Sequence, residues 1–165
     1  MIRSYSLRIA SGGLLTALLL SACTPADPRA ETSKALTDGV LLPTYSQWAE
    51  ADRRLAASAI AYCADNQTTE EAREAFVHAQ TAWAGLQPLL IGPMGEGNLA
   101  WQVQFWPDKK NLVARQVTAL LNTKPELTQA DLDGASVVVQ GLSAYEYILF
   151  DKSIDLADAA AKQRY

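Results

Sequence analysis

The chain has 165 residues, of which 49% are hydrophobic and 19% are charged. That length suits one domain with a sizeable core and is short for two. The 14 basic against 18 acidic residues argue against nucleic acid as a partner, because binding a phosphate backbone takes clustered positive charge.

The N-terminal segment, residues 1–22, has the layout of a bacterial signal peptide. Arg3 and Arg8 precede a short apolar run at residues 14–20, which Leu-Ser-Ala-Cys closes at residues 20–23. The run is too short to span a bilayer as a helix, which takes about 20 apolar residues. Small residues before a cysteine suit signal peptidase II, so we expect Cys23 to become the lipidated first residue of the mature protein. The alternative is an ordinary secretory signal with a structural Cys23.

Export would place the mature protein in the cell envelope. Removal of residues 1–22 takes away Arg3 and Arg8 and leaves a formal net charge of −6. Thr24 is not the aspartate that favours retention in the inner membrane, so the periplasmic face of the outer membrane is expected in a Gram-negative cell. Residues 23–32 contain two prolines and predict a tether, with one helical domain at residues 33–165.

The first half of that domain predicts two helices. Apolar residues recur near a 3.6-residue period from Val40 to Tyr62, and Pro43 should start or kink this helix. After a turn, Thr68 or Thr69 can cap a second helix that ends near Pro88.

The second half predicts a loop, an aromatic cluster and two more helices. Residues 92–98 are rich in glycine and form the loop, and Pro107 should force Trp106 out of helical geometry. Asp108 can cap a helix from Leu112 to about Asn122. A last helix is expected from about residue 127 to residue 151. The prediction is an all-α bundle of about four to five helices.

Glu146 is the residue in the last helix that calls for an explanation. Residues 134–150 contain no other charge, so a helix here should be buried on nearly every side. A buried carboxylate is costly unless it is paired, hydrogen-bonded or bound to a metal.

Three segments resemble the imelysin family, the M75 peptidase-like family, and in particular its lipoprotein branch. They are Leu-Pro-Thr-Tyr at 42–45, Phe-Trp-Pro-Asp at 105–108, which contains Trp106 and Pro107, and Gly-Leu-Ser-Ala-Tyr-Glu-Tyr-Ile-Leu-Phe at 141–150. The resemblance covers residues from about 37 to the end. It implies an exported protein of two helical bundles, of which this chain would supply one, with a link to iron uptake or to metallopeptidase activity.

The family signature Gly-x-His-x-x-Glu places a histidine and a glutamate on one helix face, where they could share a metal ion. Gly141 and Glu146 match this signature, but Ser143 stands at the histidine position. A serine hydroxyl is a poor ligand for zinc or iron. The sole histidine, His78, is expected to be a partly exposed structural residue of the second helix.

Two explanations of Glu146 remain open. In the structural one, it accepts hydrogen bonds from Ser143, a tryptophan or a tyrosine, or pairs with Arg115 or Lys109. In the functional one, Glu146, Ser143 and Asp108 face a polar cleft that binds a small ligand or a metal ion, iron or zinc. The aromatic residues are expected in the core and the cap of the bundle; they are Trp83, Trp101, Phe105 and Trp106.

Cys63 would be the one thiol left in an oxidising compartment. It is either a buried core cysteine or one that lacks its disulfide partner. The resemblance implies roughly twice this length, so the chain is expected to be an N-terminal fragment, and Cys63 to pair with a cysteine beyond residue 165.

Three functions follow from these observations. The first is a non-catalytic, lipid-anchored protein of the cell envelope with a binding role, linked to iron or another metal. The second is a metallopeptidase, against which the missing histidine weighs. The third is a lipoprotein that binds other envelope proteins.

Overall fold

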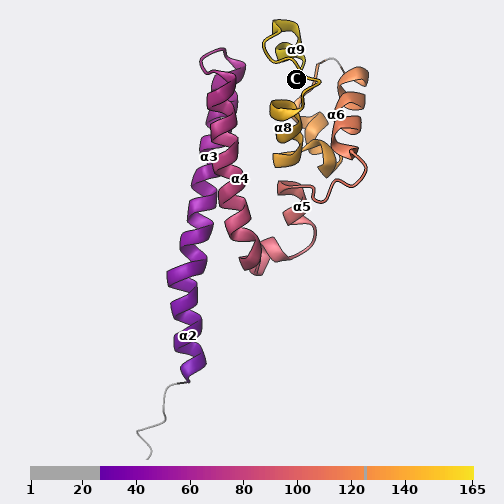
Figure 1. The fold of residues 1–165 in the computed structure, drawn as a ribbon. Coiled ribbons are helices and arrows are strands. Elements are labelled where there is room, and N and C mark those ends of the chain that lie inside the picture. The colour runs from indigo at the N-terminus through magenta and orange to yellow at the C-terminus, as the bar shows by residue number, and fades with distance from the viewer. Residues whose placement is uncertain (1–26, 125) are drawn as a thin grey trace, which may run out of the picture. The chain divides into compact units, whose positions relative to one another are not determined.

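The computed structural model describes residues 27–124 and 126–165, in which every regular element is a helix (Figure 1). This confirms the all-α fold class. None of the described helices is both long and apolar enough to cross a membrane. The expected signal peptide at residues 1–22 and the lipidation site Cys23 lie outside the described residues.

The chain divides into two compact units, residues 1–40 and residues 41–165. In the first unit, helix α2 (Pro28–Leu36) begins inside the segment expected to be a tether. Pro28 does not prevent this, because it occupies the first turn of the helix, where its missing N–H would have no intrahelical partner. The Asp27 carboxylate caps the helix by accepting a hydrogen bond from the Arg29 amide. A π-helical turn follows at Thr37–Leu41.

The second unit opens with a long helical hairpin of α3 (Leu42–Cys63) and α4 (Thr69–Leu86). Both were predicted, with Pro43 in the first turn of α3. Thr68 caps α4 in a capping box, in which its hydroxyl accepts from the Glu71 amide while the Glu71 carboxylate accepts from the Thr68 amide. The capping box fixes the start of α4 within the turn that the sequence predicted.

A loop region with little regular structure leads from α4 to α6. It contains the 3-10 turns Gln87–Leu89 and Gly92–Gly95 and the short helix α5 (Leu99–Val103). Trp106 and Pro107 lie outside any helix, as the proline predicted. Helix α6 (Leu112–Thr123) then begins where Asp108 was expected to cap it.

The prediction of a single long helix from about residue 127 to residue 151 is wrong. The structure instead has α7 (Gln129–Asp133), a 3-10 turn (Val137–Val139) and α8 (Gly141–Phe150), followed by α9 (Ala159–Arg164). Gly141 has a φ of +64°, which interrupts the helix. A Cβ at this position would lie 2.4 Å from the carbonyl oxygens of Gln102 and Val103, so only glycine allows α8 to start this close to α5.

Helix α8 lies between two groups of buried side chains. On one side Leu142 and Leu149 pack with residues of α3 and α4, including Trp83, which is 1% exposed. On the other side Ala144 packs with Val113 and Val117 of α6. Because α8 contributes to both groups, its orientation is fixed, and so is the direction in which its remaining faces point.

Candidate functional site

A cleft of about 280 Å³ lies beside α8 and brings together the site residues that the sequence singled out. Ser143 and Glu146 reach it from α8, while Trp106 and Asp108 reach it from the segment before α6. The other lining residues are Phe105, Asn111, Val113, Ala114, Tyr147, Phe150 and Asp151. The candidate residues are therefore neighbours in space, although they come from two distant segments of the chain.

Ser143 connects the two walls of the cleft. The side chain is buried, and its hydroxyl donates a hydrogen bond of 3.0 Å to the backbone carbonyl oxygen of Phe105. Gly141, at the start of the same helix, brings α8 against Gln102 and Val103, which makes this contact reachable. The serine at the signature's histidine position thus holds the segment that contains Trp106.

Asp108 is engaged by the backbone of α6. Its two carboxylate oxygens accept hydrogen bonds from the amides of Leu112, at 2.7 Å, and Val113, at 3.0 Å. Burial alone would raise the pKa of Asp108, but these amides, the Lys110 amide and the charge of Arg115 outweigh it and hold the pKa below its ordinary value. Asp108 is therefore an ionised helix cap at neutral pH, and its oxygens are already occupied.

Glu146 is exposed, which corrects the expectation of a buried carboxylate. Within the described residues it forms no hydrogen bond or ion pair, so none of the partners considered for it, including Ser143, Arg115 and Lys109, holds it. The reason is that α8 is only ten residues long and packs through Leu142, Ala144 and Leu149, which leaves the face of Glu146 open. Its carboxylate is free to meet a ligand.

The aromatic residues were expected in the core and the cap of the bundle, but several of them are exposed. Trp83 is buried, but Trp106 is 69% exposed, Trp101 is 51% exposed and Phe150 is 42% exposed. Trp106 and Phe150 line the same cleft as Glu146. Aromatic side chains that line one cleft offer an apolar surface to a partner.

Sequence reasoning missed Asp151 and Phe150 as members of the site. The Asp151 carboxylate accepts hydrogen bonds from the Ser153 hydroxyl and amide, which lower its pKa below the ordinary value. The position of Asp151, directly after the signature helix and close to Glu146 in the chain, could have indicated that it belongs to the site. With Asp108 and Glu146 it makes three carboxylates around one cleft, and no Lys, Arg or His is among the described residues that line it.

These residues do not fit a resident metal ion. In the described part of the chain, no three His, Cys, Asp or Glu side chains are grouped so that they could hold one. Ser143 donates to a carbonyl and Asp108 caps a helix, which leaves Glu146 as the one uncommitted ligand of the expected set. His78 is exposed on α4 and lines a different groove, with Glu74 and Gln47.

Cys63 is exposed and has no disulfide partner in the described residues, so the first of the two alternatives for it, a buried core cysteine, is wrong. Nothing in the described residues tests its expected pairing with a cysteine beyond residue 165. Cys63 is not among the residues that line the cleft.

Fold and cleft together define an all-helical protein with an acidic and aromatic cleft beside its signature helix. The family model for imelysin, which is the M75 peptidase family, matches residues 41–165. The chain therefore belongs to the imelysin family, and the resemblance seen in the sequence is confirmed. Searches of the curated proteins and of the solved structures find no match to it.

Proposed function

We propose that this chain is an exported, lipid-anchored member of the imelysin family that binds a ligand at the cell envelope without catalysing a reaction. The signal-like segment at residues 1–22 and Cys23 support export and anchoring. The cleft beside α8 supports a binding role, because its lining includes one carboxylate without a protein partner and two exposed aromatic side chains, Trp106 and Phe150.

This proposal rests on one observation: two of the three site residues are already bonded within the protein, and the third is not. Ser143 and Asp108 hold the walls of the cleft through hydrogen bonds to the backbone, whereas Glu146 is exposed and unpaired in the described structure. A zinc peptidase needs three protein ligands and an open position. The described cleft has one uncommitted carboxylate in place of three ligands, which supports a binding role over a peptidase centre.

The chemistry of the cleft favours an organic cation such as an amine or a guanidinium. Three carboxylates line it without a cation among its lining residues, and Trp106, Tyr147 and Phe150 offer aromatic faces. Aromatic faces attract ammonium and guanidinium groups by about 0.5–2 kcal/mol. Arg73 already lies over the ring of Phe150, 5.5 Å from its centroid, so one face of this ring holds a cation within the fold. Iron or zinc is the weaker alternative, since a single free carboxylate is a poor metal site.

The proposal can be tested by titrating protein expressed from the full sequence, kept in detergent, with butylguanidinium and, separately, with zinc and iron(II). Binding of butylguanidinium should be lost in Glu146→Gln and retained in Glu96→Gln, a control in which an exposed carboxylate outside the cleft is neutralised. Equal binding by both variants, or none by the parent protein, would overturn the cationic ligand. Stoichiometric binding of zinc or iron(II) that is lost in Glu146→Gln would instead show that the cleft binds a metal ion. Hydrolysis of an unfolded protein that a chelator abolishes would overturn the non-catalytic role.

A further inference from the structure

Arg73 lies on α4, but its side chain reaches the end of α8. Its Nε donates a hydrogen bond of 2.9 Å to the backbone carbonyl oxygen of Leu149. That oxygen belongs to the last turn of α8, where carbonyl groups have no partner inside the helix. Leu149 is 1% exposed, so little water can take the place of this donor. Arg73 therefore caps the C-terminal end of α8, where a positive charge also interacts favourably with the helix dipole.

The same side chain contacts the ring of Phe150, the last residue of α8. The guanidinium carbon of Arg73 lies over this ring, 5.5 Å from its centroid. Phe76, three positions further along α4 and so on the same helix face, packs against it with 5.4 Å between the ring centroids. Two side chains of α4 thus support a ring that lines the cleft together with Glu146.

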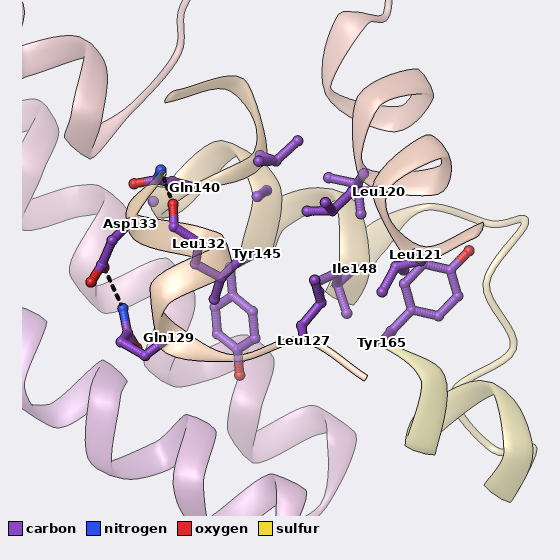
Figure 2. A pocket seen from close by; sticks show the side chains of 14 residues that line it. Leu120, Leu121, Leu127, Gln129, Leu132, Asp133, Gln140, Tyr145, Ile148 and Tyr165 are labelled. Atoms are coloured by element: carbon purple, nitrogen blue, oxygen red, sulfur yellow. Dashed lines mark hydrogen bonds between the residues drawn. The ribbon is translucent and has the colours of Figure 1, made fainter. Parts of the chain in front are cut away.

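Packing against α6 and α7 leaves a hollow beside α8. Figure 2 shows Tyr145 and Ile148 of α8 at this hollow, together with leucine side chains such as Leu120 and Leu132. Its volume is about 360 Å³. Side chains that border a hollow make fewer contacts than those in a close-packed core. We therefore expect the contacts from α4 to contribute much of what fixes the end of α8.

The Arg73 guanidinium has only a weak ion pair to compete with these contacts. Its distance to the Glu70 carboxylate is 3.7 Å, and the Glu70 side chain is 74% exposed. An ion pair this long and this exposed contributes little. Arg73 is not among the residues that line the cleft, so an effect of Arg73 on the cleft has to pass through Phe150.

We infer that Arg73 is a positioning residue for the cleft. By bonding the Leu149 carbonyl oxygen and contacting the ring of Phe150, it keeps that ring on the cleft wall. This inference rests on the proposed function, in which Phe150 offers an aromatic face to an organic cation. Loss of Arg73 should therefore weaken binding through the ring and no further than loss of the ring itself.

Fluorine NMR of the full chain in detergent tests the positioning without a ligand. The sequence has three phenylalanines, so labelling with 4-fluorophenylalanine gives signals from Phe76, Phe105 and Phe150. Arg73→Met keeps a long side chain but removes the donor and the charge, so it should shift the Phe150 signal and leave that of Phe105 in place. Arg73→Lys, which retains a donor and the charge, should restore most of the parent position. Arg53→Met removes an exposed arginine of α3 as the matched control and should leave all three signals unchanged. An unmoved Phe150 signal in Arg73→Met would overturn the inference.

A double-mutant cycle then connects Arg73 to binding. Arg73→Met and Phe150→Leu should each weaken binding of butylguanidinium about three- to tenfold, the effect of one lost aromatic contact with a cation. The double variant should bind no more weakly than Phe150→Leu alone, because Arg73 acts through the ring. Additive losses, or an equal loss in Arg53→Met, would overturn the inference. Failure of the parent protein to bind butylguanidinium would overturn the proposed function instead, while the fluorine signals still decide whether Arg73 positions the ring.

Discussion

The hydroxyl of Ser143 donates a hydrogen bond to the backbone carbonyl oxygen of Phe105, over 3.0 Å. The two residues are 38 positions apart, and the bond joins α8 to the segment that contains Trp106 and Asp108. The family signature has a histidine at this position, where an imidazole could bind a metal. Here the same position stabilises the wall of a cleft.

Ser143→Ala should therefore reduce stability. The substitution removes the donor and leaves the Phe105 carbonyl unpaired, so we expect the free energy of unfolding to fall by about 1–2 kcal/mol. Urea unfolding followed by circular dichroism measures this loss. Ser46→Ala, an exposed serine on α3, is the matched control and should change stability by less than about 0.5 kcal/mol. Equal stability of both variants would show that the Ser143 bond contributes nothing.

Gly141→Ala should be more damaging. An alanine at a φ of +64° costs about 1–2 kcal/mol, and its Cβ would meet two carbonyl oxygens at 2.4 Å, which forces α8 away from α5. We expect a total loss of at least about 2 kcal/mol in the same unfolding measurement. Gly85→Ala, near the end of α4 with no atom within 4 Å of the new Cβ, should instead gain a few tenths of a kcal/mol. Tolerance of alanine at both positions would contradict this account of Gly141.

Gly141 also explains why the break in the helix before α8 could not be predicted from the sequence. Helices α3, α4 and α6 could be predicted because their signals are local, namely apolar periodicity, Pro43, Thr68 and Asp108. The break before α8 depends on the approach of Gly141 to Gln102 and Val103. That contact joins segments far apart in the chain, and the composition of residues 134–150 alone favours one continuous helix.

For the site, the sequence predicted the residues but not their environments. Asp108, Ser143 and Glu146 line one cleft, as the functional explanation of Glu146 required. The exposure of Glu146 was missed, because a segment with a single charge suggests burial on all sides, whereas α8 packs on only part of its surface. Whether a side chain is exposed depends on which elements pack against its helix, and the pattern of one segment does not show that. For the same reason Trp106 was expected in the cap of the bundle and is largely exposed.

Asp108→Ala should lower stability in a pH-dependent way. At neutral pH the loss should be about 1–2 kcal/mol, the value of a good helix cap. The pKa of Asp108 is lower in the folded state than in the unfolded state, so its contribution is present above its ordinary pKa of 3.8 and is lost as pH falls through the lower folded value. The stability difference between parent and variant should therefore shrink below about pH 4. A difference that stays constant from pH 7 to pH 2 would contradict the role of the ionised carboxylate.

Tyr145→Phe should have the opposite effect on stability. Because the Tyr145 hydroxyl is buried without a partner in the described structure, we expect its removal to be neutral or to raise the free energy of unfolding by about 1 kcal/mol. Tyr45→Phe, the control, removes a hydroxyl that donates to the Ile91 carbonyl oxygen at 3.2 Å and should cost about 0.5–1.5 kcal/mol.

The raised pKa of Tyr145 adds a test at alkaline pH. Burial raises the pKa of Tyr145 from an ordinary value of 10.0 to about 12 in the folded state. Tyr145 therefore ionises less readily in the folded state than in the unfolded state, so the free energy of unfolding falls as pH rises from 10 to 12. Tyr145→Phe should lose less stability than the parent over that range in urea unfolding. A parallel loss in both proteins would mean that the hydroxyl has a partner or is solvated.

Lipid anchoring can be tested with the two cysteines as a matched pair. Signal peptidase II requires the cysteine after its cleavage site, so Cys23→Ser should abolish incorporation of labelled palmitate and leave the leader at residues 1–22 uncleaved. Cys63→Ser changes a free, exposed thiol at the end of α3 and should leave labelling and processing intact. Mass spectrometry of the membrane fraction should then find an acylated N-terminus at Cys23 in the parent protein and in Cys63→Ser. An uncleaved chain would contradict the proposed export. Cleavage without an acyl chain on Cys23 would make residues 1–22 an ordinary secretory signal. The cleft beside α8 would in that case belong to a protein without a lipid anchor, and its binding experiment could be done without detergent.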